Sequence, residues 1–276
     1  MGELNDVTLS FIGSGVMAEA MISGILNNGL TAPDHIVAAD PRQERGEELA
    51  GRYGVKATTA NREAVQAAQI VVLSVKPQVL PAVLQEVQGA VMPEGLVLSI
   101  VAGARIGVMA AGLDHQAIVR AMPNTPAQIG EGMSVWTATG EVSEEQRRQA
   151  QSILQALGEE IYLEDENYLD MATALSGTGP AYVFLFMEAM IDAGVHLGFS
   201  RRIAQQLVLQ TVRGSVDFAR QSVAHPAELR NMVTSPGGTS AEALYQLEKG
   251  GFRTVLSRAI WAAYQKSQYL GELSEK

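Results

Sequence analysis

A glycine-rich turn near the start of the chain has the spacing of a phosphate-binding loop. Gly13, Gly15 and Ala18 form a G-x-G-x-x-A sequence directly after an apolar run, residues 7–12, and directly before a helical pattern. Gly13 would permit a tight turn, Gly15 would let the backbone approach a pyrophosphate, and Ala18 would let the helix pack close to the strand. The N–H groups at the start of that helix would face the phosphates. The sequence therefore predicts a dinucleotide site, although such a turn can also be purely structural.

Acidic and basic residues lie together where the adenosine end of a dinucleotide would bind, and they favour different coenzymes. Asp40 follows the second predicted strand, 35–39, where a carboxylate can bind the adenosine ribose of NAD and repel a 2′-phosphate. Arg42 and Arg45 follow at once and could instead hold that phosphate through charge-assisted hydrogen bonds. Asp40 could also only begin a turn, with both arginines in solvent. The residues alone leave the choice between NADH and NADPH open.

Two further segments directly follow apolar runs that would form strands of a parallel sheet. Lys76 follows the apolar run 70–75, and the small residues Ala102 and Gly103 follow the run 96–101. Open parallel sheets bind ligands beyond the carboxyl ends of their strands. Lys76 could therefore contact a cofactor, and the small residues could leave room for a planar ring. Both could equally be ordinary turn residues.

Glycine and hydroxyl residues open a helical pattern at 235–240. Exposed N–H groups there would bind a small anion such as a carboxylate, and a hydroxyl beside them could form one hydrogen bond to a ring nitrogen. Segment 120–126 combines two prolines with polar residues, and segment 176–181 precedes another helical pattern. Each of the three segments could instead be a rigid helix entry with a hydroxyl N-cap.

Composition excludes several classes of protein. Lys and Arg number 20 against 30 Asp and Glu, and a formal charge of −10 repels nucleic-acid backbones. The absence of cysteine excludes disulfides, zinc–thiolate sites and a thiol nucleophile. The four histidines show no metal-ligand spacing, so no metal is expected. No signal peptide pattern or membrane-length apolar run is visible, so we expect a cytoplasmic protein that binds no membrane.

Strand and helix patterns alternate in the first half of the chain and give way to helices alone in the second. The predicted strands are 7–12, 35–39, 70–75, 96–101 and 117–121, with helical patterns near 44–53, 78–88 and 105–111. This alternation predicts an α/β fold with a parallel, doubly wound sheet. From about Asn167 onward, the helical patterns are 180–196, 201–219 and 252–270. Their many apolar faces fit either an ordinary helical core or an intertwined dimer.

Five segments occur in an order and spacing typical of one family. They are FIGSGVMAEA, VLSVKPQ, RAMPNTP, LSGTGPAYVF and MVTSPGGTSAEALYQLEKGGFR. Through them the chain resembles the pyrroline-5-carboxylate reductases over essentially its whole length. The resemblance implies a Rossmann-type dinucleotide-binding domain over residues 1–165 and an all-helical, substrate-binding dimerisation domain over 166–276. It also implies a homo-oligomer, a dimer or a decamer, that reduces Δ1-pyrroline-5-carboxylate to L-proline with NADPH or NADH.

The resemblance further implies roles for individual residues. The pyrophosphate would be lined by Gly13, Gly15, Val16, Met17 and Ala18. The adenosine half would lie near Asn61, and the ribose and nicotinamide would be flanked by Val75, Lys76, Pro77, Ala102 and Gly103. The substrate carboxylate would accept from the Gly238 and Thr239 amides, and the Ser240 hydroxyl would contact the ring nitrogen as the catalytic group. Glu166 and Ser176 would lie around the substrate.

Three positions depart from the family pattern. Ser74 replaces the usual alanine of the A-V-K-P motif, Asn231 stands where an acidic residue is common, and Asp40 follows Ala39 where some relatives have a hydroxyl. The alternatives are a reductase of another cyclic imine, a hydroxyacid dehydrogenase, or a non-catalytic nucleotide-sensing protein. A dehydrogenase needs a base for its substrate hydroxyl, and the glycine-rich stretches of the helical half contain no lysine.

Overall fold

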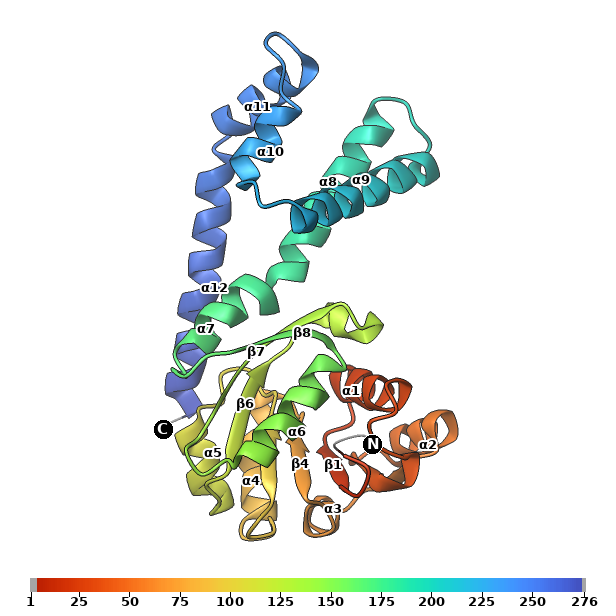
Figure 1. Ribbon diagram of the computed structural model, residues 1–276, viewed down its shortest axis with the longest axis vertical. Helices are drawn as coiled ribbons and strands as arrows, with labels where there is room; N and C mark the ends of the chain where they lie inside the picture. Colours follow the sequence, from red (N-terminus) through yellow and green to blue (C-terminus); the bar gives the residue numbers. More distant parts are fainter. Residues whose placement is uncertain (1–3, 275–276) are drawn as a thin grey trace. The chain divides into compact units, whose positions relative to one another are not determined.

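The short apolar runs of the N-terminal half pair into one eight-stranded sheet (Figure 1). In spatial order the strands are β3 (Lys56–Thr58), β2 (Ile36–Ala39), β1 (Leu9–Ile12), β4 (Ile70–Leu73), β5 (Leu96–Ser99), β6 (Ile118–Met122), β7 (Gly132–Ala138) and β8 (Gly158–Tyr162). All neighbours are parallel except β6 and β7, which are antiparallel. The strand order reverses between β1 and β4, which is the place where open α/β sheets bind their ligands.

The computed structural model describes residues 4–274, which form two units. The first unit holds the chain up to Thr178 and again from Ala263 onward, and the second holds Gly179–Ala262. The domain boundary after residue 165 stays a prediction. Residues 1–3, at the end of the chain where a signal peptide would begin, lie outside the described range.

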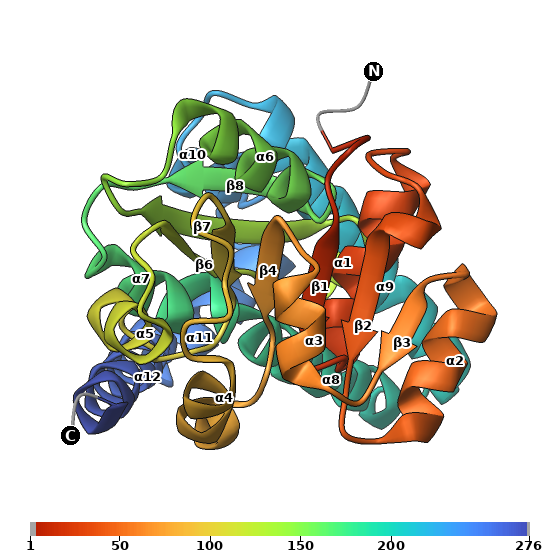
Figure 2. The same cartoon turned by 90° about the horizontal axis from the view of Figure 1, so that it is seen from below.

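Helices cover both faces of the sheet because its central strands, such as β1, β4 and β5, bury side chains on both sides. The helices of the first unit are α1 (Val16–Asn27), α2 (Gln43–Tyr53), α3 (Asn61–Gln66), α4 (Leu80–Val87), α5 (Ile106–Leu113), α6 (Glu144–Gln155) and α7 (Tyr168–Ala172). On one face, Met21 of α1 and Ile153 of α6 pack with Phe11. On the other, Leu84 of α4 and Met109 of α5 pack with Val71. Figure 2 shows the sheet between α6 and α4. The predicted doubly wound α/β fold is confirmed.

The second unit is a set of helices with little buried surface of its own. It contains α8 (Gly179–His196), α9 (Arg201–Gln221), α10 (Pro226–Met232), α11 (Thr239–Lys249) and the first part of α12 (Phe252–Ser274). Within residues 179–262, all of which the structure describes, only Ala204 and Val208 are buried. Phe184 and Leu185 are 61% and 66% exposed. Apolar faces of this extent require a covering partner.

One stretch, Tyr168–His196, is long and apolar enough to cross a membrane when judged by length and composition alone. An uncovered helix of an oligomerisation domain meets the same two criteria, because it is also apolar on several sides.

Candidate active site

The glycine-rich turn leaves a row of unpaired amides at the start of α1. Gly13 has φ +90°, and its N–H donates to Ala39 O at 2.9 Å, which ties the turn to β2. A Cβ at Gly13 would lie 2.7 Å from Val75 Cγ1, so glycine alone fits between the ends of β1 and β4. Among the described residues, the N–H groups of residues 15–18 donate to no protein acceptor. Together with the positive end of α1, they suit an anion.

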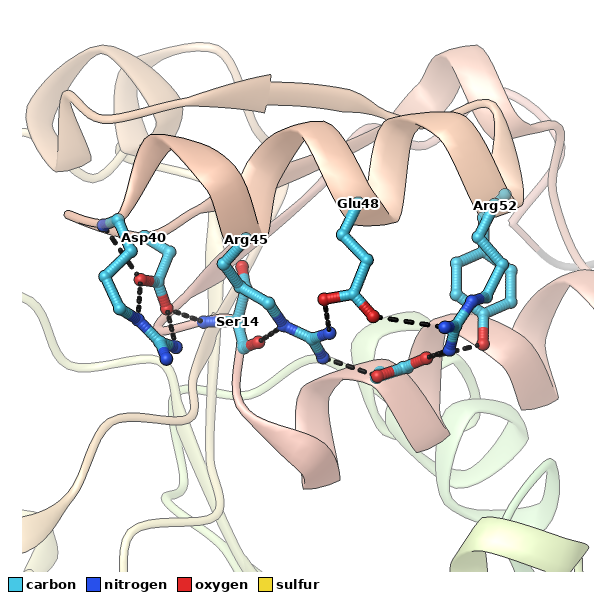
Figure 3. A network of polar contacts seen from close by, with 8 residues as sticks. Ser14, Asp40, Arg45, Glu48 and Arg52 are labelled. Atoms are coloured by element: carbon cyan, nitrogen blue, oxygen red, sulfur yellow. Dashed lines mark hydrogen bonds and ion pairs between the residues drawn. The ribbon is translucent and has the colours of Figure 1, made fainter.

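The N–H, carbonyl and hydroxyl groups of Ser14 all form hydrogen bonds to the end of β2 and the segment that follows it (Figure 3). Its N–H donates to Asp40 Oδ2 at 3.2 Å, and its carbonyl accepts from Arg45 Nε at 2.8 Å. Its hydroxyl donates to Ala39 O at 3.1 Å, and the residue is fully buried. These contacts fix the backbone of the turn before a ligand arrives, which lowers the entropy cost of binding.

Arg45 belongs to a chain of ion pairs that continues along α2 (Figure 3). Its guanidinium pairs with Glu19 of α1 and with Glu48, and Arg52 pairs with the same two carboxylates. Burial opposes the ionisation of Glu19, but hydrogen bonds, led by the one from Arg45, and the charges of both arginines outweigh it and lower the pKa of Glu19. Because the Arg45 guanidinium is engaged inside the protein, Arg42 is the arginine that a 2′-phosphate could reach.

Lowering the pH should remove the stabilisation that Glu19 supplies. Because its pKa is lower in the folded than in the unfolded chain, Glu19 stabilises the fold above the unfolded value of about 4.3, and this contribution is lost as the pH falls through the folded pKa. We expect Glu19→Gln to lower the melting temperature by about 3 °C at neutral pH and by progressively less as the pH falls below about 4.3. Thermal unfolding followed by circular dichroism across this range measures the difference. The exposed carboxylate of Glu44 provides the control, since Glu44→Gln should change the melting temperature little at any pH. A Glu19→Gln deficit that does not shrink as the pH falls below about 4.3 would contradict the prediction.

Asp40 and Arg42 form a bidentate ion pair at the carboxyl end of β2. Arg42 Nε donates to Asp40 Oδ1 at 2.9 Å and Arg42 Nη2 donates to Oδ2 at 3.2 Å. Burial opposes the ionisation of Asp40, but the hydrogen bonds from Arg42 and Ser14 outweigh it and lower its pKa. The Asp40 side chain is 6% exposed and that of Arg42 is 65% exposed, so the carboxylate is fixed while the guanidinium is free to turn away. Glu47 and Gln43 line a cavity of about 340 Å³ beside Asp40.

The end of β4 is hydrogen-bonded to the glycine-rich turn. Ser74 Oγ donates to Gly13 O at 2.7 Å, a contact that the alanine usual at this position in the family could not make. Val75 is half-buried, Lys76 is exposed, and the adjacent strand β5 leads into Gly103, where φ is +73°. The structure therefore brings the predicted residues that follow β1, β2, β4 and β5 to one edge of the sheet.

Asn61 makes a contact that does not bear on its predicted place near the adenosine. It begins α3, and its Nδ2 donates to Glu86 Oε2 on α4 at 2.9 Å. Its role at the cofactor stays a prediction.

Ser176 lies in a π-helical turn, η4 (Thr173–Gly177), a feature often found at functional sites. Its hydroxyl donates to Ala172 O at 3.1 Å, and its carbonyl accepts from Asn124 Nδ2 at 3.1 Å. Asn124 Oδ1 also accepts from Met133 N at 2.9 Å. Asn124 thus ties segment 120–126 to the π-helical turn. Sequence reasoning singled out segment 120–126 for its two prolines and the polar residues between them, but it assigned no role to Asn124 itself.

Glu166 is engaged by the protein through one carboxylate oxygen. Glu166 Oε1 accepts from Arg120 Nη1 at 2.6 Å and from Ile106 N, at the start of α5, at 2.8 Å. The Glu166 side chain is 25% exposed, whereas that of Arg120 is 3% exposed. A direct contact between Glu166 and the substrate stays a prediction.

In the second unit, residues 235–240 form a tight turn into α11. A Cβ at Gly238 would lie 2.5 Å from Ser235 Oγ, and the Gly238 N–H already donates to Ser235 O at 3.1 Å. Among the residues that the structure describes, the N–H groups of Thr239 and Ser240 donate to no protein acceptor. The amides left for an anion are therefore those of Thr239 and Ser240, one residue further along than the predicted pair.

Comparison with known proteins gives consistent matches along the chain. A family described as pyrroline-5-carboxylate reductase dimerisation matches residues 166–270, and one described as NADP oxidoreductase coenzyme F420-dependent matches residues 8–103. A pyrroline-5-carboxylate reductase of Synechocystis sp. is 41% identical over 266 residues, covering 96% of this chain and 99% of that protein. The protein of the same name from Pseudomonas aeruginosa is 43% identical, covering 96% and 97%. The crystal structure of Plasmodium falciparum pyrroline carboxylate reductase with NADP bound has a TM-score of 0.89 at 33% identity, covering 97% and 99%.

Proposed function

We infer that this chain, which belongs to the pyrroline-5-carboxylate reductase family, reduces Δ1-pyrroline-5-carboxylate to L-proline in the last step of proline biosynthesis. It is an NAD(P)H-dependent oxidoreductase, as the sequence predicted. Its carboxyl-terminal part is a dimerisation domain, which accounts for the exposed apolar side chains of the second unit. The observation that carries the proposal is the row of free amides at residues 15–18, at the sheet edge where dinucleotides bind.

The residues at this edge fit a dinucleotide. The space around Gly15 is open, since a Cβ there would meet nothing within 4 Å, and Val16 is an apolar residue that is 62% exposed. A pyrophosphate would accept from the amides of residues 15–18, while residues 75–77 and 102–103 would flank the ribose and the ring. When bound, the reduced nicotinamide supplies the hydride that the imine carbon receives.

The start of α11 is proposed to hold the substrate. The free amides of Thr239 and Ser240 would donate to the substrate carboxylate, and Gly238 allows the tight approach of the turn. The Ser240 hydroxyl would orient the ring nitrogen. Ser176 and Glu166, which belong to the first unit, are proposed as further substrate-binding residues. An imine that enters protonated is already electrophilic, so these residues need mainly to bind and orient it.

Oxidation of reduced coenzyme on addition of the imine tests the function. We expect the absorbance of NADPH and of NADH, followed in parallel, to fall when pyrroline-5-carboxylate is added. Oxidation of a 3-hydroxy acid with no reduction of the imine would favour a hydroxyacid dehydrogenase. A chain that binds coenzyme but never oxidises it with any imine would be a nucleotide-sensing protein.

The Asp40–Arg42 pair is proposed to let the chain use both coenzymes. The Asp40 carboxylate suits the ribose hydroxyls of NADH, whereas a 2′-phosphate would have to draw Arg42 away from Asp40. We therefore propose that NADPH binds through Arg42 and that NADH is accepted as well.

Replacing Asp40 by serine should shift this balance. The variant loses the charge that opposes a 2′-phosphate and frees Arg42, so the ratio of kcat/KM for NADPH to that for NADH should rise about 10- to 100-fold. Initial rates with each coenzyme at saturating imine measure the ratio. Asp34→Ser is the matched control, because Asp34 is an exposed acidic residue before the opposite end of β2 and should leave the ratio unchanged. An unchanged ratio in Asp40→Ser would exclude this pair as the determinant.

A cytoplasmic homo-oligomer, a dimer or a decamer, is a further proposal. It is supported by the exposed apolar faces of the second unit and by the absence of cysteine, which fits a reducing compartment. Light scattering after size-exclusion chromatography distinguishes a dimer of 29.4 kDa chains from a decamer.

A further inference from the structure

The carboxyl end of α12 packs against the loop between β5 and α5, which contains Ala102 and Gly103. Figures 1 and 2 both show this end of the helix beside α7 and α5. A Cβ at Gly103 would lie 3.2 Å from Leu270 Cβ, and a Cβ at Gly271 would lie 3.1 Å from Arg105 Nε. The helix and the loop therefore approach so closely that both surfaces use glycine. All of these residues belong to the first unit.

A buried carboxylate joins the helix to the loop. Asp170 Oδ1 accepts from Ser267 Oγ of α12 at 2.8 Å, and Asp170 Oδ2 lies 3.1 Å from Arg105 Nη2 at the end of the loop. Asp170 is 1% exposed and Ser267 is 4% exposed. A buried carboxylate needs several donors to offset its lost hydration, so each of these contacts matters to the position of the loop.

A second carboxylate fixes the residue after the loop. Glu166 Oε1 accepts from Ile106 N at 2.8 Å, which caps the start of α5, and from Arg120 Nη1 at 2.6 Å. Arg120 Nη2 also lies 3.8 Å from Asp170 Oδ1, so the two carboxylates share one arginine. Glu166 and Asp170 thus hold the two consecutive residues, Arg105 and Ile106, at which the loop becomes helix.

We propose that Ser267 is a positioning residue for the cofactor: through Asp170 and Arg105 it holds the β5–α5 loop in the place from which Ala102 and Gly103 contact the nicotinamide end. The inference rests on the proposed cofactor role of these two loop residues. It adds to the active site a residue of α12 that none of the five family-like segments contains.

Ser267→Ala tests the proposal with the full-length chain. One donor to the buried carboxylate is lost, so Arg105 and the loop gain freedom, and we expect the dissociation constant of NADPH to rise about 5- to 20-fold. The KM for NADPH should rise by a similar factor while the KM for the imine stays the same. NADPH binding followed by fluorescence needs no turnover, so it still reports on the loop if the wild-type chain fails to reduce the imine. In that case the proposed function fails, while the NADPH dissociation constants still decide whether this inference is correct.

Two further variants separate positioning from general stability. Gly271→Ala places a methyl group against Arg105 and should weaken NADPH binding in the same direction as Ser267→Ala. Gln268→Ala, which removes a hydrogen bond to Tyr264 within the same helix, should leave NADPH binding unchanged. Wild-type NADPH affinity in both Ser267→Ala and Gly271→Ala would overturn the proposal, as would an equal loss in Gln268→Ala.

Discussion

Replacing Gly13 by alanine should raise the dissociation constant of NADPH by about 100-fold, which corresponds to about 2.7 kcal/mol. Gly13 has φ +90°, a conformation that costs other residues about 1–3 kcal/mol. The new Cβ would lie 2.7 Å from Val75 Cγ1 and 3.0 Å from Val75 N, so the ends of β1 and β4 must move apart. Both ends carry proposed cofactor contacts, so one methyl group would disturb several of them together. Titration of NADPH followed by its fluorescence measures the loss.

Two other glycines show whether the effect belongs to the site. Gly29 also has a positive φ, +62°, and a Cβ there would meet nothing within 4 Å. Gly29→Ala should therefore lower the melting temperature without changing NADPH affinity. Gly15→Ala still tests the site if Gly13→Ala fails to fold. Because open space surrounds Gly15, this variant should fold normally, while its methyl group occupies the place of a pyrophosphate. Wild-type NADPH affinity in both site variants would contradict the phosphate-loop assignment.

Sequence reasoning located the strands whose own apolar residues account for their burial. The predicted runs at 70–75 and 96–101 correspond to β4 and β5, in which every residue is buried between two layers of helices. By contrast, β8 contains two glutamates and is half-buried or exposed along its length. It is a strand because it pairs with β7, and no local pattern encodes that pairing. The antiparallel placement of β7 beside β6 was missed for the same reason.

The residues of the candidate site also fall into two groups: those that local sequence motifs indicate and those that only the folded chain brings together. Glycine, proline and hydroxyl motifs act through the local backbone, so the sequence indicated Gly13, Gly15 and the turn before α11. The side chains that hold these segments come from distant parts of the chain: Arg45 reaches Ser14 across 31 residues, and Ser267 reaches Asp170 across 97. Such partners follow only from the folded chain, because charge and spacing in the sequence do not specify which acceptor a long side chain will find.

Replacing Ser240 by alanine should lower kcat by about 10- to 100-fold and leave the dissociation constant of NADPH unchanged. The N-cap of α11 is Gly238, so Ser240→Ala removes no capping hydrogen bond. Alanine also keeps the backbone N–H and favours the helix. The variant therefore retains the amides proposed to bind the carboxylate and loses only the hydroxyl proposed to orient the ring nitrogen. Steady-state kinetics at saturating NADPH, with kcat and the imine KM determined separately, measure the effect.

The neighbouring residue makes this experiment selective. Thr239 carries a hydroxyl one position earlier and is proposed to act only through its amide, so Thr239→Ala should keep kcat near the wild-type value. Ser240→Thr restores a hydroxyl at the position and should recover most of the lost turnover. If Thr239→Ala loses as much activity as Ser240→Ala, or if Ser240→Ala turns over normally, the turn binds the substrate without orienting its nitrogen. The electrophilic imine would then accept hydride with no help from a side chain at this position.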